Sequence, residues 1–280
     1  MSISIVTDSN CDLPQAMVDE FGITVVPLYI NIGQKSYLDG VEMSRQEFYE
    51  GLPHFDTHPM TSVPGPGVFV ETFEALASEG ATEILCVHIA SSLSAMANSA
   101  RLAAEQWDKL PVTVFDSGNL TLGTGLQAVA AAKAAAEGHS MAEIMALLEE
   151  LAPRTYCFAA LDTVEFLRRS GRLTRFQWGL ASVLQIKPLL CLDDGHVGAL
   201  AKPRTRPKAI RLLVRRMAEQ VGDRPLHAAV FHADAPAEAE DLRQRLADQF
   251  DCVELYVTEF TPVMGAHTGP GLLGVAFYGE

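Results

Sequence analysis

Short apolar runs alternate with helical segments along this chain, and this alternation limits its possible folds more than any other feature. Apolar runs at 3–7, 84–89 and 112–115 predict buried strands, each followed by a polar turn and a stretch of helical periodicity. Helices are predicted at 13–21, 45–51, 68–79, 95–107, 120–136 and 141–151. Repeated β–α units predict a parallel sheet with helices on both faces.

The second half of the chain predicts a mixed sheet. Pro153-Arg154 marks a candidate boundary, and the turn Asp193-Asp194-Gly195 separates two apolar runs, which indicates a hairpin. Strands are predicted at 156–161, 186–192, 196–201, 226–231, 252–259 and 272–278. Helices are predicted at 175–184, 206–221 and 236–250, after a short helix that is capped by Asp162 and ends at Ser170-Gly171. We therefore expect an α/β protein with two domains, 1–153 and 154–280.

Several predicted helices carry local capping signals. Asp12, followed by Pro14 and Gln15, predicts the start of the first helix, and Ser140-x-x-Glu143 is a capping box. Asp162-x-x-Glu165 and Thr205 predict two further helix starts. The stretch 23–32 is strand-like throughout.

Composition narrows the class of protein. The 280 residues are 48% hydrophobic, yet no apolar run is long enough to span a membrane, and the N-terminus lacks a secretory signal pattern. The five cysteines are scattered without metal-ligand spacing, which indicates free thiols in a reducing cytoplasm and argues against zinc. We expect a cytoplasmic protein without a metal or cofactor.

Charge is distributed unevenly. The net charge of −14 argues against general nucleic-acid binding. The segment 168–216 holds 12 of the 21 lysines and arginines but only two aspartates, so it carries +10 and the remainder carries −24. This segment is either a docking face or anion site, or a pair of solvated helices.

Four polar turns are candidates for a binding site: 7–12, 61–65, 91–94 and 116–117. In open parallel sheets, ligands bind at the carboxyl ends of the strands. Ser91, Ser92 and Ser94 lie between a predicted strand and a helix start, where free backbone N–H groups favour anions. The alternative is that one of these serines only caps the helix.

A glycine-rich stretch, 263–274, holds a histidine and a threonine between glycines. His267 and Thr268 are either aimed at a ligand, with the glycines leaving room for its approach, or part of a simple turn before the last strand. Its G-x-G-x-x-G match at 269–274 is not a dinucleotide site, because no βαβ unit follows.

The chain lacks G-x-S-x-G, H-E-x-x-H and Walker A motifs. A Ser-His-Asp triad from Ser92 or Ser94, His267 and Asp116 requires a fold that brings these residues together. Hydroxyls, a histidine and many apolar residues fit a hydrogen-bonded carboxylate better than covalent catalysis.

Motifs in order along the whole chain resemble those of the DegV family. They are Thr7-Asp8-Ser9, Asp12-Leu13-Pro14, Thr61-Ser62-Val63-Pro64, Ser91-Ser92-Leu93-Ser94, Asp116-Ser117, Phe166-Leu167-Arg168-Arg169-Ser170-Gly171-Arg172-Leu173, Ile186-Lys187-Pro188 and Ala266-His267-Thr268-Gly269-Pro270-Gly271. The resemblance implies a DegV-like fold, with an N-terminal parallel sheet, a C-terminal mixed sheet and an acyl-chain pocket at or near their interface.

Members of this family resemble the fatty-acid-binding subunit of bacterial fatty acid kinase. The resemblance implies a bacterial lipid-binding protein, not itself an enzyme, whose bound long-chain fatty acid is phosphorylated by a separate ATP-dependent kinase. By motif, the residues that the family uses to bind the carboxylate correspond to Thr61, Ser94 and His267. We add their neighbours Ser62 and Thr268 as candidates.

This sequence departs from the family pattern at two turns. Ala95-Met96 replaces the family's Gly-Thr after Ser94, and Val63-Pro64-Gly65 replaces Gln-Pro-Ser. Arg172 and Arg204 are the candidates for meeting the kinase. The alternatives are a serine hydrolase or esterase using Ser94 and His267, or a carrier of another small anionic lipid.

Overall fold

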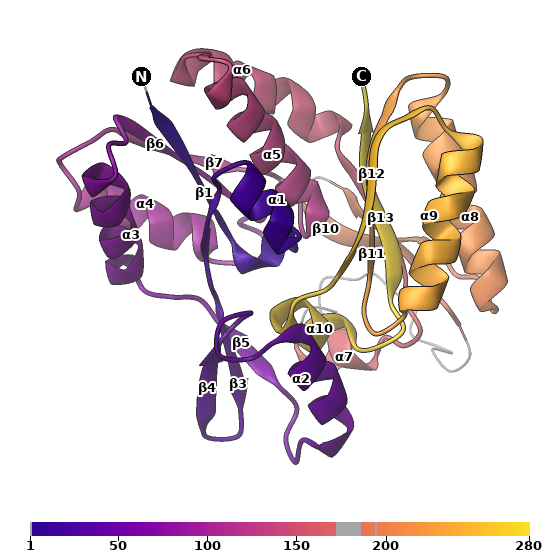
Figure 1. The fold of residues 1–280 in the computed structure, drawn as a ribbon. Coiled ribbons are helices and arrows are strands. Elements are labelled where there is room, and N and C mark those ends of the chain that lie inside the picture. The colour runs from indigo at the N-terminus through magenta and orange to yellow at the C-terminus, as the bar shows by residue number, and fades with distance from the viewer. Residues whose placement is uncertain (1, 172–185, 194) are drawn as a thin grey trace.

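The computed structural model describes residues 2–171, 186–193 and 195–280, and its strands form three sheets (Figure 1). The first is a parallel sheet in the order β2-β1-β6-β7. Its strands are β1 (Ile3–Asp8), β2 (Thr24–Val26), β6 (Glu83–His88) and β7 (Val112–Asp116). A small antiparallel sheet, β4-β3-β5, is formed by β3 (Tyr29–Ile32), β4 (Lys35–Leu38) and β5 (Met60–Ser62).

The third sheet is mixed and has the order β10-β9-β8-β13-β11-β12. Its strands are β8 (Tyr156–Ala160), β9 (Leu189–Asp193), β10 (His196–Ala201), β11 (Leu226–His232), β12 (Cys252–Glu259) and β13 (Leu273–Gly279). β11 and β12 are parallel, and the other neighbours are antiparallel. The expected fold class and the hairpin β9–β10 are confirmed.

Helices cover the sheets in layers. They are α1 (Gln15–Glu20), α2 (Arg45–Gly51), α3 (Pro66–Ser78), α4 (Met96–Glu105), α5 (Leu122–Ala136), α6 (Met141–Leu151), α7 (Glu165–Arg169), α8 (Arg206–Val221), α9 (Pro236–Gln249) and α10 (Pro262–Thr268). α3 and α4 flank the parallel sheet, α8 and α9 flank the mixed sheet, and α5 lies between the sheets (Figure 1). No described helix meets the length and hydropathy that a membrane span requires.

Two sequence features explain the central place of α5. It is rich in alanine, and its side chains are buried on nearly all sides, as expected for a helix that is apolar all round. A Cβ at Gly125 would lie 2.8 Å from the carbonyl oxygen of Cys11, so only glycine permits this approach. The domain division at 153/154 stays a prediction, and the sheets support it, since the parallel and mixed sheets draw their strands from opposite sides of it.

Asp12 does not cap α1 as its local sequence predicted. Its backbone is left-handed, with φ 52°, and it ends the short 3₁₀ turn η1 (Ser9–Cys11). Its carboxylate instead accepts the backbone N–H of Thr261, at 2.7 Å, and the hydroxyl of Thr121, at 2.7 Å. Two donors that are distant in sequence therefore outweigh the local capping signal.

Other local predictions differ from the structure. The stretch 23–32 is largely strand, as predicted, but it divides into β2 and β3, which belong to different sheets. Asp162 does not cap α7, since its carboxylate accepts from Lys187 at 2.8 Å while the hydroxyl of Thr163 receives the N–H of Glu165. Thr205 precedes α8 but makes no side-chain cap bond. The helix expected at 175–184 lies outside the described residues.

Two predictions at functional stretches also differ from the structure. Thr61 and Ser62, expected in a turn, lie on β5 and pair with β3. Residues 262–268, expected as a turn, form the helix α10, which begins with Pro262 in its first turn. The capping box Ser140–Glu143 at α6 is confirmed, and the helix at 45–51 is found as α2.

Asp12 makes stability depend on pH. Burial raises the pKa of its carboxyl to about 7, and burial also raises the pKa of Asp39 to about 6. The folded protein therefore binds protons more tightly than the unfolded chain between about pH 4 and pH 7. The free energy of unfolding should fall as pH rises through this range, by at most about 1.4 kcal/mol per pH unit for each group.

We predict that Asp12→Asn reduces this slope while Asp39 keeps part of it. Asparagine tolerates the left-handed backbone, and its carboxamide can accept from Thr261 and donate to Thr121. Urea unfolding at several pH values measures the slope, with exposed Asp19→Asn as the matched control. An unchanged slope in Asp12→Asn would show that this carboxyl does not titrate with folding.

Candidate functional site

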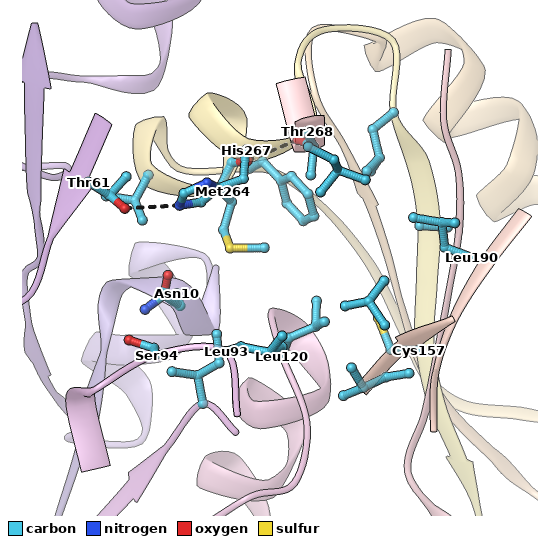
Figure 2. A pocket seen from close by; sticks show the side chains of 18 of the residues that line it. Asn10, Thr61, Leu93, Ser94, Leu120, Cys157, Leu190, Met264, His267 and Thr268 are labelled. Atoms are coloured by element: carbon cyan, nitrogen blue, oxygen red, sulfur yellow. Dashed lines mark hydrogen bonds between the residues drawn. The ribbon is translucent and has the colours of Figure 1, made fainter. Parts of the chain in front are cut away.

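A cavity of about 470 Å³ lies between the parallel and mixed sheets (Figure 2). Most of its wall is apolar. The apolar lining residues are Leu28, Val63, Ile89, Leu93, Ala95, Leu120, Ala159, Leu161, Leu167, Leu190, Leu192, Val197, Phe231, Phe260, Val263, Met264 and Leu272. The cavity can therefore hold a long apolar molecule away from water.

One end of the cavity carries polar side chains from three distant segments. Thr61 on β5 and His267 on α10 meet across it, with 2.9 Å between Oγ1 and Nε2. Ser94, in the turn before α4, faces them from the opposite wall (Figure 2). All five predicted ligand residues, Thr61, Ser62, Ser94, His267 and Thr268, line this one cavity.

The five hydroxyl and imidazole groups are not equally available. The hydroxyl of Thr268 donates to the carbonyl of Met264 at 2.9 Å, and that of Ser62 accepts from Asn31 at 3.1 Å. Within the described part of the chain, the hydroxyl of Ser94 receives only the N–H of Met96, at 3.4 Å. Thr61, Ser94 and His267 are therefore the better placed groups for a ligand.

The helix α10 positions His267. Its first turn is held by carboxylates, since Val263 N–H donates to Asp39 at 3.3 Å and Thr261 N–H donates to Asp12. A Cβ at Gly265 would lie 2.7 Å from the ring of Phe48 and 2.7 Å from the hydroxyl of Tyr49. Gly269 has φ 72°, and a Cβ there would overlap Phe166. These two glycines serve close packing of the helix, and this corrects our expectation that they leave room for a ligand.

The serines of the turn 91–94 have different roles. Ser92 donates its hydroxyl to the carbonyl of Gly195 and so ties this turn to the hairpin β9–β10. Ser91 donates its N–H to Asp116, whose other oxygen accepts from Gly118 at 3.0 Å. Asp116 is thus bound to backbone and is not among the described residues that line the cavity. The structure therefore does not bring Asp116 together with Ser94 and His267 as a triad would require.

The departure at Ala95-Met96 leaves the turn intact. Ala95 has φ −84°, an ordinary value for any residue, so no glycine is required there. Met96 is fully buried and packs in the core beneath α4. Its side chain is therefore part of the core, and Ser94 remains as the hydroxyl that this turn presents to the cavity.

Charge is scarce around the cavity. No aspartate, glutamate, lysine or arginine occurs among the lining residues in the described part of the chain, and His267 is the one base. Burial raises the pKa of the Cys157 thiol, which lines the wall, so this sulfur stays protonated and unreactive. Residues 2–171, 186–193 and 195–280 contain no cluster of metal ligands.

Asn10 lines the polar end and was not chosen from the sequence. The turn 7–12 was recognised as a candidate edge, but nothing local distinguished this residue from Ser9 or Asp12. Its position follows from η1, which turns Asn10 toward the cavity and Asp12 toward α5 and α10.

Of the two candidate docking residues, the structure describes only Arg204. Arg172 lies outside the described residues. Arg204 is exposed between β10 and α8. Much of the basic segment is paired with acids: Arg168 and Arg169 with Glu165, Lys187 with Asp162, Arg206 with Glu238, and Arg215 and Arg216 with Glu219. For the arginines of α7 and α8, these ion pairs favour the alternative of solvated helices.

Comparisons with known proteins agree with this architecture. The family model described as "Uncharacterised protein, DegV family COG1307" matches residues 2–280. The DegV domain-containing protein SCO2569 of Streptomyces coelicolor is 38% identical over 275 residues, which cover 98% of this chain and 97% of that protein.

Two solved structures have the same fold. A DegV family protein from Thermus thermophilus, described for its fatty acid binding, is 32% identical with a TM-score of 0.92. DegV from Bacillus subtilis, described as a fatty acid binding protein, is 30% identical with a TM-score of 0.93. Each comparison covers 100% of both chains. The match along residues 2–280, together with these relatives, shows that the chain belongs to the DegV family.

Proposed function

We propose that this protein binds a long-chain fatty acid, with the acyl chain in the cavity and the carboxyl group at its polar end. The main support is the polar end of the apolar cavity. There Thr61 and His267, which are 206 residues apart, are hydrogen bonded to each other. The Thermus and Bacillus relatives, both described as fatty acid binding, support this assignment.

The energetics of an acyl chain fit this cavity. Burying one methylene contributes about 0.8 kcal/mol, so roughly fourteen contribute ~11 kcal/mol before costs. Association and ordering offset several kcal/mol of this. The head group then needs hydrogen-bonding partners, because an unpaired polar group in the cavity would oppose binding.

A kinase partner extends the proposal. A fatty acid buried by its chain leaves the carboxyl as the reactive group, and a separate ATP-dependent kinase phosphorylates it on the protein. The protein then acts in the cytoplasm as a carrier that presents substrate and performs no catalysis alone. Arg204 supports this step as an exposed cation without an ion pair among the described residues.

The first prediction concerns the ligand itself. Protein purified from bacteria should contain about one fatty acid per chain, of roughly C14–C18, because the cavity wall is apolar along its length. Solvent extraction followed by mass spectrometry measures this. Recovery of a different amphiphile would favour the alternative anionic-lipid carrier. If the purified protein contains no lipid and cannot be loaded with fatty acid, the proposed function is wrong.

The second prediction concerns the head group. Leaving a buried polar group without its hydrogen-bond partner costs about 1–3 kcal/mol, so His267→Ala should lower fatty-acid affinity by up to about a hundredfold. Thr61→Val should lower it less. Exposed His139→Ala is the matched control. If His267→Ala lowers the melting temperature but binds as tightly as wild type, the histidine only stabilises α10.

The third prediction concerns docking. Rim charges act mainly on encounter rate and salt dependence, so Arg204→Glu should slow phosphoryl transfer by the kinase and leave fatty-acid affinity nearly unchanged. Exposed Arg101→Glu, on α4, is the control. Arg172→Glu is expected to behave like Arg204→Glu. A loss of lipid binding in either variant would assign that arginine to the pocket.

A further inference from the structure

At the polar end of the cavity, one carboxamide oxygen accepts no hydrogen bond from the described residues. Asn10 is 3% exposed and lines the cavity. In Figure 2 its carboxamide lies between Thr61 above and Ser94 below, with the oxygen on the side of Thr61. Asn10 is therefore close to the groups that the proposed function assigns to the fatty acid.

The orientation of this carboxamide is fixed by Asp8. One carboxylate oxygen of Asp8 accepts the backbone N–H of Asn10 at 3.0 Å. The same oxygen lies 2.7 Å from the carboxamide of Asn10. Since this oxygen is already an acceptor, the carboxamide must present its NH₂ end to it, and the carbonyl oxygen is left on the cavity side.

Asp8 is itself held in place. Its second oxygen lies 2.7 Å from Nδ1 of His88, and both residues are fully buried. The chain His88–Asp8–Asn10 thus runs from the core of the parallel sheet to the polar end of the cavity. A carboxamide gripped in this way cannot rotate to exchange its oxygen for its nitrogen without breaking a buried hydrogen bond.

The oxygen of Asn10 accepts no hydrogen bond from the described residues. Because Asn10 lines the cavity, this oxygen is open to a ligand there, and a ligand that donates to it gains a hydrogen bond. An ionised carboxylate offers no donor and would place its negative oxygens against that of Asn10. A protonated carboxyl group offers both a donor and an acceptor. Its O–H can donate to Asn10, and its carbonyl oxygen can accept from Thr61 or Ser94.

The charges that the described residues place around this end favour the neutral form as well. Within that part of the chain, the titratable groups that line the cavity are His267 on α10 and the thiols Cys157 and Cys191 on β8 and β9. Behind Asn10 lie Asp8 and His88. Asp12 and Asp39 lie across η1, where they hold the start of α10. Among these groups only the two histidines can carry positive charge.

We propose that Asn10 is a head-group residue and that the fatty acid is bound as the protonated acid, with its O–H donated to the carbonyl oxygen of Asn10. This inference rests on the proposed function and names its ligand class. Amphiphiles whose head group both donates and accepts are selected. Alkyl sulfates, which stay ionised and offer no donor, are rejected.

The experiment is ¹³C NMR of [1-¹³C]palmitic acid bound to the wild type, to Asn10→Leu and to the exposed control Asn98→Leu. In the wild type and the control, the bound carboxyl should be protonated at pH 7. In Asn10→Leu its titration should move down by about one pH unit or more, a tenfold loss of proton affinity. Competition with hexadecyl sulfate should show a similar loss of preference for the acid.

Each outcome decides the inference. An ionised carboxyl in the wild type at pH 7 overturns the inference. This outcome needs no variant, so the test stands even if Asn10→Leu folds poorly. A protonated carboxyl that titrates identically in Asn10→Leu removes Asn10 from the head-group site. If wild-type protein gives no bound palmitate signal, the proposed function itself fails and the inference falls with it.

Discussion

Burial of α5 between the two large sheets is the constraint on which the rest of the structure depends. The helix contacts β1 and β6 on one side and β8 and β13 on the other, so its diameter sets the spacing of the sheets. Alanine and glycine keep that spacing small, as the approach of Gly125 to Cys11 shows. The helix begins at Leu122, and Leu120 already lines the cavity. The cavity therefore occupies the space between the sheets just beyond the start of the helix.

Asp12 connects this helix to the polar end of the cavity. One carboxylate holds Thr121 at the start of α5 and Thr261 at the start of α10, and α10 carries His267 at its far end. A buried carboxylate is costly, which is why its pKa rises to about 7, and its two hydrogen bonds offset part of that cost. The position of His267 thus depends on Asp12, a residue whose local sequence predicts a cap for the first helix.

Periodicity predicted most of the fold, because the apolar runs of β1, β6 and β11 and the helices α5, α8 and α9 are long or strongly patterned. The errors occur where long-range contacts decide the local structure. Asp12 has donors more than a hundred residues away, and α10 forms from a glycine-rich stretch because its glycines allow Phe48 and Phe166 to pack close. Thr61 and His267 were chosen through family resemblance, whereas their mutual contact requires the fold. Asn10 has no such motif and was missed.

Selectivity in such a cavity must come from its polar end. Apolar walls discriminate weakly between ligands, since each methylene changes affinity by little, whereas a buried polar group left without a partner rejects a ligand strongly. The walls favour long chains of many kinds, but the end offers hydroxyls, one imidazole and the fixed oxygen of Asn10. Because a hydroxyl can rotate to donate or accept while the carboxamide held by Asp8 cannot, our proposal assigns the chemical requirement on the head group to Asn10. In that proposal the buried pair Asp8–His88 contributes to ligand selection by fixing the carboxamide.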